Sequence, residues 1–195
     1  LYRIEIAGRA AHAGLEPERG ANAGVELAHV ILAMAALGDS ALGTSVTPTV
    51  AAAGTAANMV PAEARLDVDV RAWTLAEQER VDVAVRAMEP RTSGVEWALS
   101  GGPNRPPLEE DATRALFRRA QGVAVRLGLG ELGAARVGGA SDGNLTAGIG
   151  VPTLDGLGAV GGGAHADDEH VVAGELPGRI RLLEGLLADL LDQRR

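Results

Sequence analysis

His165 has the sequence neighbours that metal chemistry requires. It follows three glycines and an alanine, and Asp167, Asp168 and Glu169 come shortly after it. Histidine and carboxylate groups bind zinc, but a catalytic zinc needs about three protein ligands and one open position. The chain has no cysteine, so no thiolate could complete such a site. One histidine is not a site, and a solvated acidic turn is the alternative interpretation. His170, beside two valines, is a weaker candidate.

Two further segments could contribute polar groups to a site. His12 lies among small residues just past a predicted strand, where its imidazole would be accessible, although a surface loop histidine is the simpler interpretation. Residues 138–144 place Ser141 and Asp142 before a predicted helix, so backbone N–H groups and the helix dipole could hold a substrate carboxylate. An ordinary helix cap is the alternative. The chain has no lysine, which argues against a phosphate loop in this segment.

Arg71 is a candidate for recognising a carboxylate. It ends a predicted strand whose polar face also carries Asp67 and Asp69. A fixed guanidinium binds a carboxylate through two parallel hydrogen bonds, which suits substrate recognition. A surface ion pair with one of the two aspartates is the alternative. His29 lies inside a predicted helix and is interpreted as structural.

The elements that would position the first candidates form one predicted domain. Residues 1–8, 63–73 and 95–99 have the period of a half-buried strand, and residues 45–53 are rich in residue types that favour strands. Two segments with apolar residues at helical spacing are 21–37 and 75–88. This βαββαβ order predicts a ferredoxin-like sandwich over residues 1–101. Pro48 cannot donate to a sheet ladder, so we expect its strand at an edge.

The remaining residues predict a second, smaller set of elements. Residues 102–107 are rich in glycine and proline and are predicted to form a linker. The elements expected in residues 108–195 are a helix over about 109–127, a short strand before Gly138, a helix from Ser141, a strand around 152–154 and a helix over 175–192. These alternating helices and strands are too few for a complete α/β domain. The expected fold class is therefore α/β, with an α+β domain followed by half of an α/β domain.

Composition excludes several function classes. Twenty-six acidic residues outnumber 18 basic ones, all arginine, and the net charge of −8 argues against binding to nucleic acid or to an anionic membrane. No apolar run approaches the length of a spanning helix. The absence of cysteine fits a reducing compartment, so we expect a cytoplasmic protein.

Taken together, these segments resemble the zinc peptidase family that includes glutamate carboxypeptidase, acetylornithine deacetylase and succinyl-diaminopimelate desuccinylase. The resemblance runs nearly from end to end. Its motifs, in order, are residues 8–14 with Pro17, Gly20, Asn22 and Ala23; 58–61; 67–71; 138–144; and 152–158 leading to 163–165 and Glu169. Each motif is weak alone, whereas their order and spacing together are specific.

The resemblance implies that residues 1–101 are a lid domain that also makes a homodimer, often by joining edge strands. His12 matches the lid histidine that reaches into the partner subunit's site and stabilises the oxyanion of the tetrahedral intermediate. Asn58 and Arg71 match lid residues that hold the substrate, with Arg71 taking its carboxylate. The strand that contains Pro48 is the candidate for the joining edge.

The resemblance also implies the chemistry of the second part. Ser141 and Asp142 match residues that line the substrate pocket, and His165 matches the last zinc ligand. In this family two zinc ions activate a bridging water, a glutamate acts as general base, and an amide bond is cleaved. The substrate class implied is a small peptide or N-acyl amino acid with a free carboxylate.

The departure from the family is as informative as the match. The family's N-terminal half, with its His-x-Asp ligands, bridging aspartate and Glu-Glu pair, has no counterpart here, and the chain opens within a predicted strand. We therefore expect a fragment of a zinc exopeptidase that is inactive alone. The alternatives are a non-catalytic dimerisation and substrate-recognition module, and an unrelated ferredoxin-like binding protein.

Overall fold

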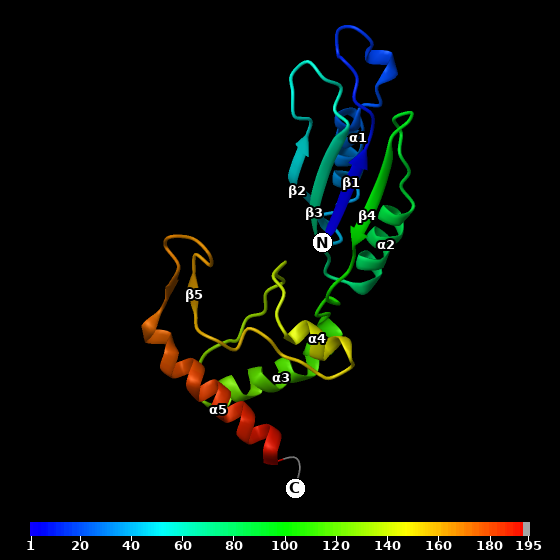
Figure 1. The fold of residues 1–195 in the computed structure, drawn as a ribbon. Coiled ribbons are helices and arrows are strands. Elements are labelled where there is room, and N and C mark those ends of the chain that lie inside the picture. The colour runs from blue at the N-terminus through cyan, green and yellow to red at the C-terminus, as the bar shows by residue number, and fades with distance from the viewer. Residues whose placement is uncertain (193–195) are drawn as a thin grey trace. The chain divides into compact units, whose positions relative to one another are not determined.

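Four strands form one antiparallel sheet in the order β2-β3-β1-β4 (Figure 1). They are β1 (Tyr2–Ala7), β2 (Ser45–Ala53), β3 (Glu63–Arg71) and β4 (Glu96–Gly101), and they are connected in part by the helices α1 (Ala23–Ala35) and α2 (Leu75–Arg86). The chain order is βαββαβ, as the sequence predicts. The computed structural model describes residues 1–192, in two compact units that divide between Pro107 and Leu108.

The core of the first unit lies between the sheet and its two helices. Side chains of β1 alternate strictly between buried and exposed, with Ile4 fully buried between Leu66 of β3 and Leu99 of β4. The helices contribute the other buried side chains of this core, among them Leu27, Val30, Met34, Val81 and Val85. The apolar alternation in the sequence therefore reports the helix-covered face of the sheet.

Helix α1 carries apolar residues on both of its faces. Its buried residues are Ala23, Glu26, Leu27, Val30 and Met34. The evenly spaced apolar positions on its other face include Val25 and Leu32, whose exposed fractions are 46% and 70%. A helix that is apolar all round is usually covered on every side. The outer face of α1 is instead uncovered in a single copy of the chain.

β2 is an edge strand, as Pro48 predicts. Its register with β3 shifts between Pro48 and Val50, which makes Thr49 the extra residue of a bulge. The Thr49 hydroxyl donates to the carbonyl oxygen of Asp67 at 3.1 Å and so fastens the bulge to β3. Every residue of β2 after the bulge is exposed.

The second unit is built mainly from helices. Its elements are α3 (Glu110–Arg126), α4 (Gly143–Gly148), α5 (Leu176–Asp192) and the short strands β5 (Gly161–Gly162) and β6 (His170–Val171); the single-turn 3₁₀ helices are η1 (Pro17–Arg19), in the first unit, and η2 (Ala173–Glu175). α3 and α5 pack through Val123 and Leu182, among others. Nη2 of Arg119 in α3 lies 2.8 Å from Oδ2 of Asp189 in α5, so an ion pair also joins the two helices.

Two predicted strands of this unit are not formed. In the described part of the chain, the residues just before Gly138 and residues 152–154 have no regular secondary structure. The backbone N–H and C=O groups of a strand must pair with a neighbouring strand. The local sequence of a segment does not reveal whether such a neighbour is present. The hairpin of β5 and β6 was missed because its strands are too short to show a period. Among the helices of residues 1–192, none is long and apolar enough to span a bilayer.

Candidate functional site

His12 and Asn58 lie on adjoining loop segments of the first unit. His12 forms an isolated β-bridge with Met59, and the N–H of Ala13 donates to the carbonyl oxygen of Asn58 at 2.9 Å. The His12 ring is exposed, and its Nδ1 accepts the N–H of Gly14 at 3.1 Å. An Nδ1 that accepts leaves the proton of the neutral ring on Nε2. His12 therefore presents Nε2 as a hydrogen-bond donor to an incoming group.

Two glycines allow this loop to pack closely against the segments that precede α1 and β3. A Cβ on Gly8 would lie 2.1 Å from the carbonyl oxygen of Ala21, and a Cβ on Gly20 would lie 2.8 Å from Cγ1 of Val60. Real side chains do not reach such distances, so both positions require glycine. The small residues of this motif are thus needed for backbone contact, which holds the loop that carries His12.

Arg71 lies at the other end of β3. Its Nη2 donates to Oδ2 of Asp69 at 2.8 Å. This hydrogen bond lowers the pKa of Asp69 below its usual range, and its effect is larger than that of burial, which raises the pKa. The ion pair between Arg71 and a neighbouring aspartate, which was the alternative interpretation of the sequence, is therefore present. Eight residue steps of strand, about 26 Å, separate Arg71 from Glu63, and Asn58 precedes Glu63. The structure does not bring Arg71 together with His12 and Asn58 within one copy.

Ser141 and Asp142 lie at the start of α4 in the second unit. The Ser141 hydroxyl accepts the N–H of Gly143 at 3.1 Å, although the N-cap residue of α4 is Asp142, whose side chain makes no cap hydrogen bond. A hydrogen bond between Ser141 and the Asp155 carboxylate, together with the N–H of Gly156, holds the pKa of Asp155 below its usual range. The Ser141 hydroxyl therefore both accepts and donates hydrogen bonds within its own loop.

Arg179 fixes the same loop from α5. Its Nε donates to the carbonyl oxygen of Gly158 at 2.8 Å, and its Nη2 donates to that of Gly156. This loop leads toward His165 along the chain. Sequence reasoning missed Arg179, because backbone carbonyls leave no side-chain signal that could predict the contact.

His165 lies in a tight turn after β5. Its φ of 66° is in the left-handed region, which costs a residue other than glycine about 1–2 kcal/mol. The side chain is exposed, and the N–H of His165 donates to Oε2 of Glu169 at 3.4 Å. Within residues 1–192, no three His, Cys, Asp or Glu side chains are grouped closely enough to hold a metal ion. The described residues therefore do not supply a complete zinc site.

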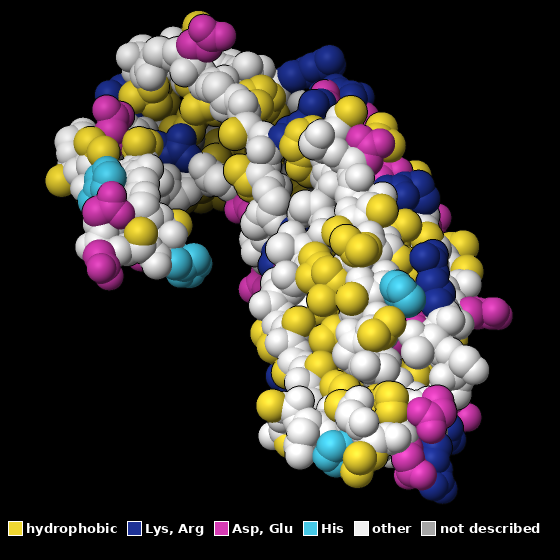
Figure 2. Space-filling model, turned by 90° about the horizontal axis from the view of Figure 1, so that it is seen from above, with side chains coloured by type: hydrophobic (Ala, Val, Ile, Leu, Met, Phe, Trp, Pro, Cys, Tyr) yellow, Lys and Arg dark blue, Asp and Glu magenta, His cyan; other side chains and the backbone are white. Residues whose placement is uncertain are grey.

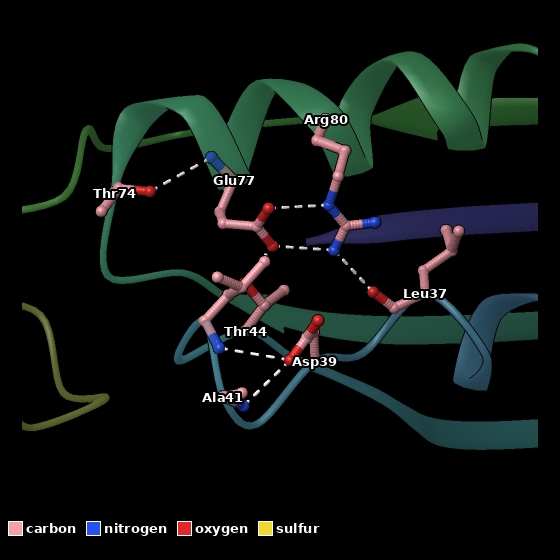
Figure 3. Close-up of polar contacts among 8 residues, drawn as sticks. Leu37, Asp39, Ala41, Thr44, Thr74, Glu77 and Arg80 are labelled. Carbon is pink, nitrogen blue, oxygen red and sulfur yellow. Dashed lines mark hydrogen bonds and ion pairs between the residues drawn. The ribbon is translucent and has the colours of Figure 1, made fainter.

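A buried carboxylate that the sequence analysis missed organises the approach to β2 (Figure 3). The Thr44 hydroxyl donates to Oε2 of Glu77 at 2.6 Å, and Arg80 donates to both carboxylate oxygens at 2.8 Å. Arg80 also reaches the carbonyl oxygen of Leu37 at 2.8 Å. Thr74 and Glu77 have the spacing of a capping box, which was an available signal. Their contacts join α2 to the segment between α1 and β2.

We expect Glu77→Gln to reduce the loss of folding stability that the protein suffers at acidic pH. Hydrogen bonds from Arg80 and then from Thr44 lower the pKa of Glu77 from 4.5 to about 2. A lowered pKa in the folded state adds stability that is fully present above about pH 4.5 and is lost as the pH falls toward 2. The variant should be less stable at pH 7, and its stability should fall less steeply across that window in denaturation series.

The matched control for this experiment is Glu79→Gln, two residues along α2 on an exposed position. It removes the same charge without removing the contacts to Thr44 and Arg80. Equal pH dependence in the two variants would contradict the role given to Glu77.

Comparison with known proteins places this geometry in a family. Residues 1–89 match the peptidase dimerisation domain of M20 peptidases. Carboxypeptidase G2 of Pseudomonas sp. (strain RS-16) is 32% identical over 203 residues, which cover 96% of this chain and 46% of that protein. The first unit therefore contains an M20 peptidase dimerisation domain. It is similar to carboxypeptidase G2 across both units and spans about half of that relative's length.

Solved structures show the same fold. Aminopeptidase PepT from Bacillus cereus aligns with a TM-score of 0.69 at 23% identity, over 95% of this chain and 50% of that one. The aminobenzoyl-glutamate utilization protein from Klebsiella pneumoniae aligns with a TM-score of 0.51 at 26% identity, over 77% of this chain and 41% of that one. The first of these supports the fold alone.

Proposed function

We propose that this chain is the lid and C-terminal part of a zinc-dependent M20 hydrolase. The complete protein would cleave a small peptide or N-acyl amino acid that carries a free carboxylate. The observation that carries this proposal is the 32% identity to carboxypeptidase G2 across nearly the whole chain. In this proposal residues 1–101 are a ferredoxin-like lid, 102–107 a linker, and 108–195 the C-terminal part of the catalytic domain.

His12 is proposed to act as an oxyanion donor in the partner subunit of a homodimer. Its Nε2 carries the proton that such a role needs, and its ring is exposed. A donor aimed at the charge that develops in the transition state stabilises it more than the ground state. Arg71 is about 26 Å of strand away from this end of the sheet, so one copy cannot place both groups on one small substrate. This separation supports a site that combines two copies, with Asn58 beside His12.

Arg71 is proposed to bind the substrate carboxylate. Its guanidinium already holds the geometry of a carboxylate pair with Asp69, so a substrate would share or replace that partner. Ser141 and Asp142 are proposed to line the substrate pocket. Because the Ser141 hydroxyl is engaged by Gly143 and Asp155, we infer that this side chain shapes the pocket instead of donating to the substrate.

His165 is proposed as one ligand of a two-zinc centre in the complete protein. Zinc there would supply an activated water. Because residues 1–192 contain no group of three ligands, we assign no step of the reaction to a metal held by this chain alone. The same observation favours a second candidate function for the 195 residues, a non-catalytic dimerisation and substrate-recognition module.

We expect the chain to neither bind two zinc ions tightly nor hydrolyse an N-acyl glutamate. The reason is that His165 is a single candidate ligand, whereas a catalytic zinc needs about three from the protein. Zinc content after dialysis, measured by elemental analysis, and an amidase assay with added zinc would test this. If the chain bound two zinc ions and hydrolysed the substrate, the proposal that it needs the remaining part of the complete enzyme would be wrong.

A further inference from the structure

The hairpin of β5 and β6 carries His165 in its connecting turn. Each of its strands has only two residues. At the base of the hairpin, the N–H of Val172 donates to the carbonyl oxygen of Val160 at 2.8 Å. A two-stranded hairpin is at best marginally stable by itself in water. The position of His165 therefore depends on contacts that the hairpin makes with other segments.

The segment that leads into this hairpin is rich in glycine. Five of the eight residues from 156 to 163 are glycine, and Gly156 and Gly163 have φ angles of 74° and 70°. Glycine loses more backbone freedom on folding than any other residue, so such a segment is costly to hold in one conformation. The left-handed φ of His165 adds to this cost, and such a conformation persists only where the surroundings fix it. Neither effect is offset by burial, because the side chain of His165 is exposed, and Figure 2 shows histidine side chains on the surface of this unit.

Arg179 of α5 anchors the segment before the hairpin. Its Nε donates to the carbonyl oxygen of Gly158 at 2.8 Å, and its Nη2 donates to the carbonyl oxygen of Gly156. Hydrogen bonds from a charged donor are stronger than those between neutral groups. The strand β6 on the other side of the hairpin continues into α5 through η2. The hairpin is therefore joined to α5 on both sides, through the chain itself after β6 and through Arg179 before β5.

The anchored segment also contacts Ser141. The carboxylate of Asp155 takes part in a hydrogen bond with the Ser141 side chain, and its Oδ1 accepts the N–H of Gly156 at 2.7 Å. Residues 155–158 are therefore held from the start of α4 by Ser141 and from α5 by Arg179. The same short segment touches the proposed substrate pocket and leads to the proposed zinc ligand.

We propose that Arg179 is a positioning residue whose guanidinium fixes residues 156–158 and thereby holds the hairpin that places His165. The role of His165 as a zinc ligand rests on the proposed function, whereas the anchoring of the hairpin does not. A ligand that the fold already holds in place loses less conformational freedom when the metal binds, so the metal binds more tightly. Arg179 itself touches neither zinc nor substrate and acts only through His165.

Hydrogen exchange in the 195-residue chain tests the anchor. Arg179→Met removes both hydrogen bonds and keeps an unbranched apolar side chain. We expect the amide of Val172 to exchange about tenfold faster by NMR, because the base of the hairpin opens more easily. Arg181→Met is the matched control, since Arg181 lies two residues further along α5 and donates to the carbonyl oxygen of Leu127 at 2.9 Å. It removes the same charge without touching the hairpin and should leave the exchange at Val172 within about twofold.

Zinc affinity in a version of the protein extended to the length of its relatives tests the effect on His165. Arg179→Met is expected to raise the Kd of one of the two zinc ions about tenfold, measured by competition with a chromogenic chelator. Arg179→Lys keeps the charge and one donor, so part of the affinity should return. Arg181→Met should bind zinc as the unchanged protein does.

The outcomes separate the anchor from the zinc site. Equal exchange at Val172 in the two methionine variants would overturn the anchor. If the amides of α3 exchanged faster by the same factor as that of Val172, Arg179 would support the whole second unit, and the inference would also be wrong. Unchanged zinc affinity of Arg179→Met, in an extended protein that binds zinc, would overturn the positioning of His165. An extended protein that binds no zinc even with Arg179 intact would instead overturn the proposed function, and exchange at Val172 would still decide whether Arg179 anchors the hairpin.

Discussion

In a version of the protein extended to the length of its relatives, His12→Ala is expected to lower kcat by about 10²–10³-fold. The exposed ring carries its proton on Nε2, because Nδ1 accepts the N–H of Gly14. Loss of a donor aimed at the oxyanion removes stabilisation from the transition state and leaves substrate binding largely unchanged. Steady-state kinetics should therefore show a fall in kcat with little change in KM. His29→Ala, on α1 of the same unit, is the matched control.

Mixing two inactive variants should recover activity if His12 acts in the partner subunit. A heterodimer of His12→Ala and His165→Ala subunits contains one site with both residues intact. Random reassortment makes half of the dimers mixed, each with one of two sites complete, so about one quarter of the original activity is expected. No recovery after exchange, with heterodimers present, would argue that His12 works within its own subunit or not at all.

The largest expected effect on stability comes from Leu66→Ala. Leu66 is fully buried at the centre of β3, between Ile4 of β1 and Ala51 of β2. Truncating a buried leucine removes apolar burial and leaves a cavity, which costs about 2–5 kcal/mol. Domains of this size have about 5–15 kcal/mol in all, so a large share of the free energy of unfolding is at risk. Urea denaturation of variant and parent measures the loss.

Leu15→Ala is the control for this measurement. It makes the same chemical change at a position that is 76% exposed, where the effect should stay within about 0.5 kcal/mol. If both variants unfold at the same urea concentration, Leu66 does not make the contribution that its burial implies.

The first unit could be predicted from its sequence because each signal there is local. Alternation defines the strands, and Pro48 identifies the edge by what proline cannot donate. The buried face of α1 could not be predicted in this way. Apolar residues surround that helix, and a charged residue, Glu26, takes part in the buried face, where its carboxylate accepts the N–H groups of Arg91 and Thr92. Its partners lie far along the chain, beyond any local pattern.

The candidate site was predicted less completely than the fold. Residue types identified His12 and Arg71. Only the structure shows that His12 pairs with the loop before β3, whereas Arg71 ends that strand and is paired with Asp69. The pairing of Thr44 with Glu77 spans 33 positions and needed the tertiary fold. The strands expected in the second unit have suitable local sequences, yet pairing depends on neighbours that a single segment cannot specify.

The bulge in β2 has a consequence for the behaviour of the protein at high concentration. A sheet edge that is open along its whole length can recruit one chain after another into a growing fibril. In β2 the proline and the extra residue at Thr49 leave a stretch too short for that. The proline and the bulge that interrupt β2 therefore oppose the addition of one chain after another along this edge.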